Sequence, residues 1–163
     1  MDSTTFQQKF GGVFEHSPWV AEEVYKTGVE ALLTDSKKLS ARFRSVFLKA
    51  PPDLQLKTLR AHPPLVCGLA DPVDLTSESV SEQSEAGLDQ CSEAELAEFA
   101  RLNTAYTEKF GYPFIIAVRG RKRLKILNLF RMRLKNDAVL EYQTALRQAC
   151  RIAQIRIGDI VNA

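Results

Sequence analysis

The sequence predicts an all-α protein, a single compact domain of about seven to eight helices that spans residues 1–163. Three observations lead to this fold class. Apolar residues recur at helical spacing along most of the chain, residues typical of helix caps bracket those stretches, and the alternation typical of strands is nearly absent. A chain of 163 residues is also long enough to bury a core without disulfides or metal.

The first predicted helix lies in "HSPWVAEEVYKTG", where Ser17 is a natural N-cap, Pro18 suits the first helical position and Gly28 marks the end. A second helix is expected over 35–49. The third starts at the two prolines after it and presents an apolar side made of Leu54, Leu56 and Leu59. It should stop at His62, because a proline disfavours helical geometry at the residue before it.

Residues 67–92 are more polar, and two interpretations stay open for them. They suit a flexible linker, but "SESVSEQSEAGL" also has the composition of a short capped helix. The next helix is clearer, because Ser92 and Glu95 form a capping box and Gly111 marks its end. Its expected apolar face comprises Leu96, Phe99, Leu102, Ala105 and Tyr106.

The run "PFIIAV" at 113–118 resembles a strand but has no partner strand, so we expect a buried extended segment or a helical turn. Two further helices are predicted, over 123–135 and from 137 to the end. At about 100° per residue, the last helix gathers an apolar face from Tyr142, Leu146, Ala149, Cys150, Ala153, Ile157 and Ile160.

The composition excludes several classes of protein. The chain is 45% apolar and 26% charged with a net charge of +2, too balanced to indicate nucleic acid or an anionic membrane as partner. No apolar run approaches the ~20 residues of a membrane span, and the first residues lack the pattern of a secretory signal. Cys67, Cys91 and Cys150 show no paired metal-ligand spacing, which predicts buried or incidental thiols in a reduced, intracellular protein.

His62 is one of two histidines and sits at the C-terminal end of its predicted helix, in "RAHPPLV". The partial negative charge of that end favours a protonated imidazole, which suits proton donation or the binding of a carboxylate. The alternative is that the ring only caps the helix by bonding a terminal carbonyl.

Arg156 falls on the flank of the apolar face of the last helix, whereas Arg147 and Arg151 point away from it. A guanidinium held there needs an anion or several carbonyls. A carboxylate of the protein itself is one candidate. A ligand is the other, because the planar fork of arginine suits a carboxylate or a ureido carbonyl.

Three glutamates in "SESVSEQSEAGL", namely Glu78, Glu82 and Glu85, are candidate proton carriers, and the residues alone do not choose among them or exclude a solvated acidic face. The basic stretch "RGRKRLK" lacks interleaved aromatic residues, so a solvated turn is favoured over a nucleic-acid site. His16 precedes the predicted Ser17 cap and indicates local capping.

Five stretches in order resemble the family of 2-oxo-4-hydroxy-4-carboxy-5-ureidoimidazoline (OHCU) decarboxylases. They are "FGGVFEHSPWVAE", "LRAHPPL", "SVSEQSEAGL", "LNTAYTEKFGYPFIIAVRG" and "RIAQIRIGDIV", which together cover nearly the whole chain. One departure is Pro64, where the family often has "AHPDL"; it removes a backbone donor beside His62.

The resemblance implies a carboxy-lyase (lyase) that forms (S)-allantoin in urate degradation, a step of purine metabolism. It implies His62, Glu82 and Arg156 as catalytic residues. The substrate-binding residues it implies are Pro63, Ser79, Val80, Ser81, Glu82, Gln83, Phe114, Ile115, Ile116, Ala117, Val118 and Arg156. No cofactor and no metal are expected, because the ring C=N bond of the substrate accepts the electrons itself.

The expected partner is a small molecule, the ureidoimidazoline carboxylate, with no nucleic acid and no membrane. The resemblance also implies a homodimer. The ending "DIVNA" lacks a peroxisomal Ser-Lys-Leu address, which favours the cytoplasm. The alternative function is a helical protein-binding module without catalysis, whose candidate residues would not line one pocket.

Overall fold

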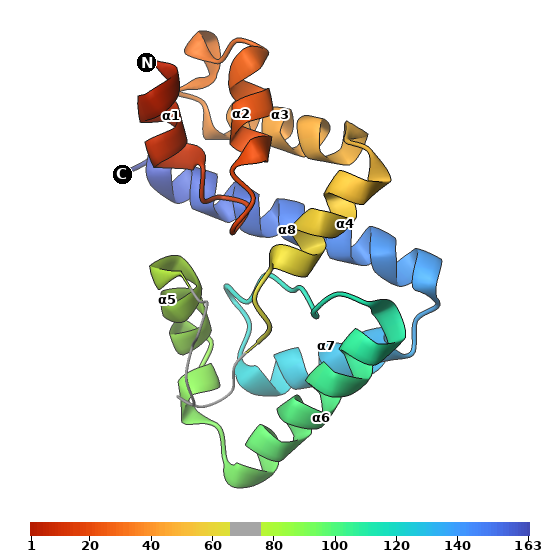
Figure 1. The fold of residues 1–163 in the computed structure, drawn as a ribbon. Coiled ribbons are helices and arrows are strands. Elements are labelled where there is room, and N and C mark those ends of the chain that lie inside the picture. The colour runs from red at the N-terminus through yellow and green to blue at the C-terminus, as the bar shows by residue number, and fades with distance from the viewer. Residues whose placement is uncertain (66–75) are drawn as a thin grey trace. The chain divides into compact units, whose positions relative to one another are not determined.

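The computed structural model describes residues 1–65 and 76–163 (Figure 1). Over these residues the chain forms eight α-helices and two short 3-10 helices, with no strand. The predicted all-α class and the predicted number of helices are therefore confirmed. None of the helices in the described ranges combines the length and the apolar character needed to cross a bilayer.

The chain divides into two compact units. The first unit contains residues 1–62 and 146–163, and the second contains residues 63–145. That the whole chain behaves as one domain stays a prediction.

The first unit begins with helix α1 (Ser3–Phe10), which the sequence analysis missed. Asp2 caps α1, because its side chain accepts a hydrogen bond from the Thr5 backbone N–H at 2.8 Å. Phe6 and Phe10 lie on its buried side with ring centroids 4.8 Å apart. Both rings also pack near Phe43, at 6.2 and 6.3 Å, so α1 supplies part of the aromatic core.

Helix α2 (Trp19–Lys26) starts two residues later than its predicted cap. Pro18 occupies the N-cap position and no side chain caps the helix, so the prediction for Ser17 was wrong. Ser17 is instead buried, and its backbone N–H donates to the Phe14 carbonyl at 3.0 Å. A turn therefore takes the place of the expected cap.

Helix α3 (Ser36–Lys49) follows the 3-10 helix η1 (Glu30–Leu32), and Asp35 caps it through the Lys38 backbone N–H. Its predicted apolar side is confirmed by the burial of Leu39, Phe43 and Phe47. The Phe43 ring packs near α1, and the Phe47 ring lies 4.7 Å from Phe14 and 6.3 Å from Trp19.

Helix α4 (Pro52–Ala61) corrects the predicted apolar side. Leu54 and Leu56 are only half-buried, and the residues that share the buried face with Leu59 are Gln55 and Thr58. Burial of these polar side chains is possible because they are hydrogen-bonded. Gln55 donates to the carbonyls of Phe47 and Leu48 at 3.2 and 3.0 Å, and the Trp19 indole N–H donates to Thr58 at 3.0 Å.

The second unit contains helices α5 (Ser77–Glu85), η2 (Leu88–Gln90), α6 (Glu93–Phe110) and α7 (Arg123–Leu134). The short capped helix is confirmed for α5, with Thr76 as its N-cap. In α6 the predicted capping box and the left-handed Gly111 are both present. Helices α6 and α7 pack against each other (Figure 1), with the Phe99 and Phe130 rings 6.3 Å apart.

Helix α8 (Ala138–Val161) contributes its first residues to the second unit and the rest to the first. Its predicted face is confirmed where Leu146, Ala149, Cys150, Ala153 and Ile157 are buried, while Tyr142 and Ile160 are half-buried. Arg147 and Arg151 are exposed, as predicted.

The three cysteines differ. Cys150 is a buried free thiol, as predicted, and burial raises its pKa to about 11. Cys91 is disulfide-bonded, so the prediction of an incidental thiol was wrong there. Cys67 lies outside the described residues.

Candidate active-site residues

His62 is held at the end of the buried face of α4. The helix ends at Ala61, and His62 is its C-cap with extended backbone (φ −67°, ψ 131°) and its N–H bonded to the Leu59 carbonyl. Gln55, Thr58, Leu59 and His62 follow the spacing i, i+3, i+4 and i+7, so they share one side of the helix. The hydrogen bonds from Gln55 to Leu48 and from Trp19 to Thr58 therefore hold this side of the helix in place. They fix the backbone that carries the imidazole, whose Nε2 atom is buried.

Arg156 is buried, with 5% of its surface exposed. Its Nη2 atom lies 3.4 Å from Glu15 Oε2, and its Nη1 atom donates to the Gly12 carbonyl at 3.3 Å. His16, next to Glu15, has φ of 58°, a left-handed conformation that turns the chain before α2. A carboxylate of the protein, the first candidate partner of Arg156, is thus confirmed, while its contact with a substrate stays a prediction.

Helix α5 separates its three glutamates by burial. Ser79 is buried and Glu82 and Gln83 are half-buried, so these three lie on the inward face of the helix. Glu78 and Glu85 are exposed, as are the predicted contacts Val80 and Ser81. Burial therefore separates Glu82 from Glu78 and Glu85, while the role of Glu82 as a proton carrier stays a prediction.

The segment from Phe114 to Val118 is buried and has no regular secondary structure, which confirms the first of its two predicted forms over the second. The Phe114 ring stacks on Phe130 with centroids 3.9 Å apart, and the Arg133 guanidinium lies 4.3 Å from the same ring. Arg133 Nη1 also donates to the Ile115 carbonyl at 2.6 Å. Stacking and hydrogen bonding thus hold the main chain of this segment.

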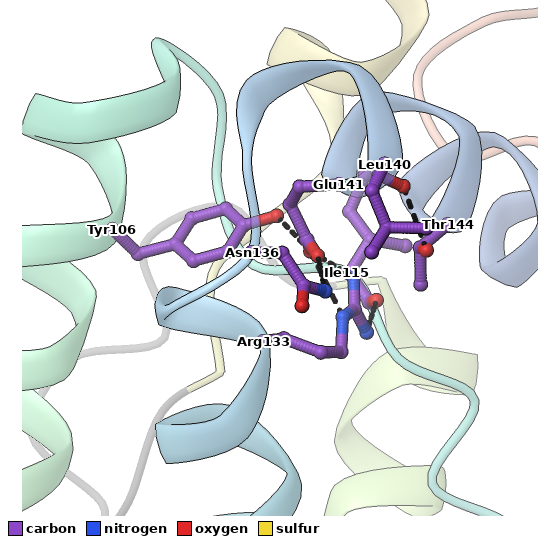
Figure 2. Close-up of polar contacts among 7 residues, drawn as sticks. All are labelled: Tyr106, Ile115, Arg133, Asn136, Leu140, Glu141 and Thr144. Atoms are coloured by element: carbon purple, nitrogen blue, oxygen red, sulfur yellow. Dashed lines mark hydrogen bonds and ion pairs between the residues drawn. The ribbon is translucent and has the colours of Figure 1, made fainter.

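A buried polar network supports that segment in the second unit (Figure 2). Its centre is Glu141, whose side chain is fully buried and lies 2.7 Å from Arg133 Nη2. The Tyr106 hydroxyl donates to the same carboxylate at 2.6 Å, and the Asn136 side-chain amide donates to its other oxygen at 3.0 Å. With Arg133 bonded to Ile115, the network links α6, α7 and α8 to the segment at 114–118.

Sequence reasoning missed this network. Arg133 and Glu141 are eight residues apart and belong to two helices, so no spacing within one helix links them. The sequence does contain one indication of burial: Arg133 and Glu141 both fall among apolar positions of their own helices, as Arg156 does.

The buried tyrosines should make the protein sensitive to alkali. Burial raises the pKa of Tyr112 to about 12, and burial together with the bond to Glu141 raises the pKa of Tyr106 further. In the unfolded chain both titrate near pH ~10. Their contribution to stability is therefore complete below pH ~10 and is lost as the pH rises through about 12.

Urea unfolding followed between pH ~8 and ~12 measures this effect as a falling free energy of unfolding. The decline should be shallower in a Tyr112→Phe variant. If ultraviolet titration of the folded protein ionised all four tyrosines near pH ~10, the burial argument would be wrong.

The basic stretch at 119–125 makes hydrogen bonds and an ion pair with other groups of the same chain. Arg121 Nη1 donates to the Ala117 carbonyl, and Arg123 Nε lies 2.9 Å from Glu95 Oε2. Lys122 Nζ donates to the Glu85 carbonyl at 3.4 Å. These contacts agree with a structural turn.

The site residues fall into two groups. His62 and Arg156 belong to the first unit, while Pro63, Glu82 and the segment at 114–118 belong to the second. Pro63 is buried and Pro64 is exposed. In the described ranges, no three His, Cys, Asp or Glu residues are grouped so that they could hold a metal ion.

Comparison with known proteins gives a consistent result. A family model described as OHCU decarboxylase matches residues 1–158. The 2-oxo-4-hydroxy-4-carboxy-5-ureidoimidazoline decarboxylase of Haloferax volcanii is 32% identical, over 98% of this chain and 90% of that protein. The uric acid degradation bifunctional protein of Bacillus subtilis is 34% identical over 99% of this chain, which spans only 31% of that longer protein.

The fold comparison agrees. A crystal structure of OHCU decarboxylase in the presence of (S)-allantoin matches with a TM-score of 0.75 and 25% identity, covering 93% of this chain and 96% of that one.

Proposed function

Because the chain belongs to the OHCU decarboxylase family, it is a decarboxylase of urate degradation, and we propose how its residues act on the substrate. The reaction converts 2-oxo-4-hydroxy-4-carboxy-5-ureidoimidazoline to (S)-allantoin and carbon dioxide. His62, Glu82 and Arg156 are the residues to which we assign the chemistry.

The chemical structure of the substrate determines which groups the protein must supply. The carbon that carries the carboxylate also bears a hydroxyl and adjoins a ring carbon doubly bonded to nitrogen. When the C–C bond to the carboxylate breaks and carbon dioxide leaves, its electron pair forms a C=C bond. The C=N electrons move to the nitrogen, which takes up a proton, and an enol remains. The enol hydroxyl then becomes a carbonyl as the neighbouring ring carbon accepts a proton. The protein must therefore bind the carboxylate, favour its departure and deliver the proton to one face.

His62 binds the carboxylate and hydroxyl end of the substrate in this proposal. Its rigid mount at the end of α4 supports the assignment, because an imidazole in fixed orientation delivers a proton to one face. Glu82 either partners His62 or carries a proton itself. A carboxylate near the departing carboxylate would also raise the energy of the bound ground state by repulsion.

Arg156 binds the ureido or ring carbonyl end. Its planar fork offers five donors, and the contacts with Glu15 and Gly12 hold the guanidinium in place. The segment from Phe114 to Val118 supplies backbone N–H donors for the carbonyl oxygens of the heterocycle, and Pro63, Ser79 and Gln83 complete the binding surface with Val80 and Ser81 at its edge.

The observation that carries the residue assignment is the burial pattern of α5. Of the three glutamates of that helix, only Glu82 shares a face with buried Ser79, whereas Glu78 and Glu85 are exposed. A carboxylate that handles a proton works better where water is partly excluded.

The experiment that tests the function generates the substrate in situ by oxidising urate and follows the product by circular dichroism. The protein should accelerate the formation of optically active (S)-allantoin. Racemic allantoin formed at the uncatalysed rate would overturn the proposal.

Assembly and location are further parts of the proposal. The family resemblance supports a homodimer, which light scattering after gel filtration would report as twice the chain mass; a monomer would refute it. The same metabolic role supports the cytoplasm. Fractionation of intact cells should recover the protein in the cytoplasmic fraction, and recovery from the membrane or the medium would contradict the assignment.

A further inference from the structure

We infer that Arg121 and Arg133 are positioning residues that strengthen two backbone donors, the N–H groups of Val118 and Ile116, for an oxygen of the ligand. The inference rests on the proposed function, because it concerns the segment to which we assign the heterocycle. It names the ligand class for these donors as a carbonyl or anionic oxygen.

The peptide group connects each arginine to its donor. A carbonyl of one residue and the N–H of the next belong to one planar unit and, in the trans form, point in opposite directions. The structure contains no cis peptide bond in the described ranges. The carbonyl of Ile115 is therefore paired with the N–H of Ile116, and the carbonyl of Ala117 with the N–H of Val118.

A guanidinium bonds each of these two carbonyls. Arg133 Nη1 donates to the Ile115 carbonyl, and Arg121 Nη1 donates to the Ala117 carbonyl. A positive charge on a carbonyl oxygen polarises the peptide group, which makes the opposite N–H a better donor. Both arginines thus act through the peptide bond on a donor that faces away from them.

The two arginines are held in different ways. Arg133 is buried and fixed by Glu141, so its position is set by the core of the second unit. Arg121 is half-buried and held by a tight turn, in which its own N–H donates to the Val118 carbonyl at 3.0 Å. Gly120 gives that turn its left-handed residue, with φ of 78°.

The donors themselves have no acceptor from the protein. Within residues 1–65 and 76–163, neither the Ile116 N–H nor the Val118 N–H forms a hydrogen bond, although both residues are buried. Buried N–H groups without an acceptor are costly and rare. Two such donors, two residues apart and each opposite a cation, favour an oxygen acceptor and disfavour a cationic ligand.

The test uses the full chain and the product (S)-allantoin as probe. In an Arg121→Met variant we expect binding to weaken about five-fold, the difference between a charge-assisted and a neutral hydrogen bond. In proton–nitrogen NMR spectra, the amide proton of Val118 should move upfield even without ligand. Arg121→Lys, which keeps a cationic donor, should restore most of both effects.

Lys125→Met is the matched control, because it removes one positive charge from an exposed position of the same basic region. It should leave binding and the Val118 amide unchanged. For the second arginine we use Arg133→Lys, which keeps a positive charge for Glu141. The single ammonium group cannot bond both the Glu141 carboxylate and the Ile115 carbonyl, so the amide proton of Ile116 should shift.

Three results would overturn the inference. They are unchanged binding in Arg121→Met, an equal loss in Lys125→Met, and amide shifts spread over the whole unit without a local effect at Val118. Failure of the unmodified chain to form or bind (S)-allantoin would instead refute the proposed function. The ligand-free amide shifts would still test the polarisation by themselves.

Discussion

A Glu82→Gln variant is expected to lose a factor of about 10² to 10⁴ in kcat, the range typical for removal of a general acid or base. The isosteric amide keeps the size of the side chain and removes its charge and its proton affinity. The measurement is the initial rate of (S)-allantoin formation from substrate generated in situ, followed by circular dichroism.

Glu78→Gln and Glu85→Gln are the matched controls for this variant. Both residues lie on α5 within one turn of Glu82, but their side chains are exposed. Each control removes the same negative charge from the same helix, so a general electrostatic effect would appear in all three variants. A similar loss in the three, or full activity in Glu82→Gln, would refute the assignment to Glu82.

His62→Ala extends the same experiment to the imidazole. We expect a comparable loss of kcat with little loss of stability, since Pro63 rather than the imidazole ends α4. A double variant with Glu82→Gln should lose scarcely more than either single variant if the two residues act as a unit. Fully additive losses would indicate two independent roles.

Local signals explain why most helices were predictable from the sequence. The Ser92 capping box and the left-handed Gly111 involve residues within one turn of each other, so their physics is present in the printed sequence. The stop at His62 is equally local, because Pro63 alone enforces it. Asp2 carries the same kind of signal, yet its short helix was overlooked.

Polar residues inside the protein were harder to predict, because their partners are distant in sequence. Gln55 and Thr58, rather than Leu54 and Leu56, share the buried face of α4 with Leu59, because they are hydrogen-bonded to Phe47, Leu48 and Trp19. Arg156 pairs with Glu15, 141 positions away. A hydropathy pattern predicts that such side chains are exposed, since it contains no information on the distant residues that form hydrogen bonds with them.

The candidate site shows the same division. The residue pattern of α5 left three glutamates open, because all three suit the composition of a polar helix, and only the family resemblance singled out Glu82. Burial sets Glu82 apart from Glu78 and Glu85, and its role stays a prediction. The arginines behind the segment at 114–118 were read as parts of a solvated turn and a helix. In the structure both arginines donate to carbonyls of this segment, contacts that no local pattern predicts.

The largest loss of stability is expected from Arg133→Met. The variant leaves the Glu141 carboxylate, fully buried, without its cation. Removal of one partner of a buried ion pair costs about 3–5 kcal/mol, which is a large part of the ~5–15 kcal/mol that stabilises a typical domain. Urea unfolding at neutral pH measures the change as a lower midpoint with an unchanged slope.

Arg131→Met is the control on the same helix. Arg131 also pairs with a glutamate, Glu98, but both side chains are partly exposed, so the cost should be about 0–1 kcal/mol. Equal losses in the two variants would show that burial does not determine the cost.

A double variant, Arg133→Met with Glu141→Leu, separates the charge from the hydrogen bonds. Removing both charges should recover part of the loss, because no unpaired ion stays buried. Recovery should be incomplete, since the Tyr106 hydroxyl and the Ile115 carbonyl each lose a bond that they make in the native network. Full recovery would mean that those bonds contribute little, and no recovery would mean that the unpaired carboxylate was not the cause of the loss.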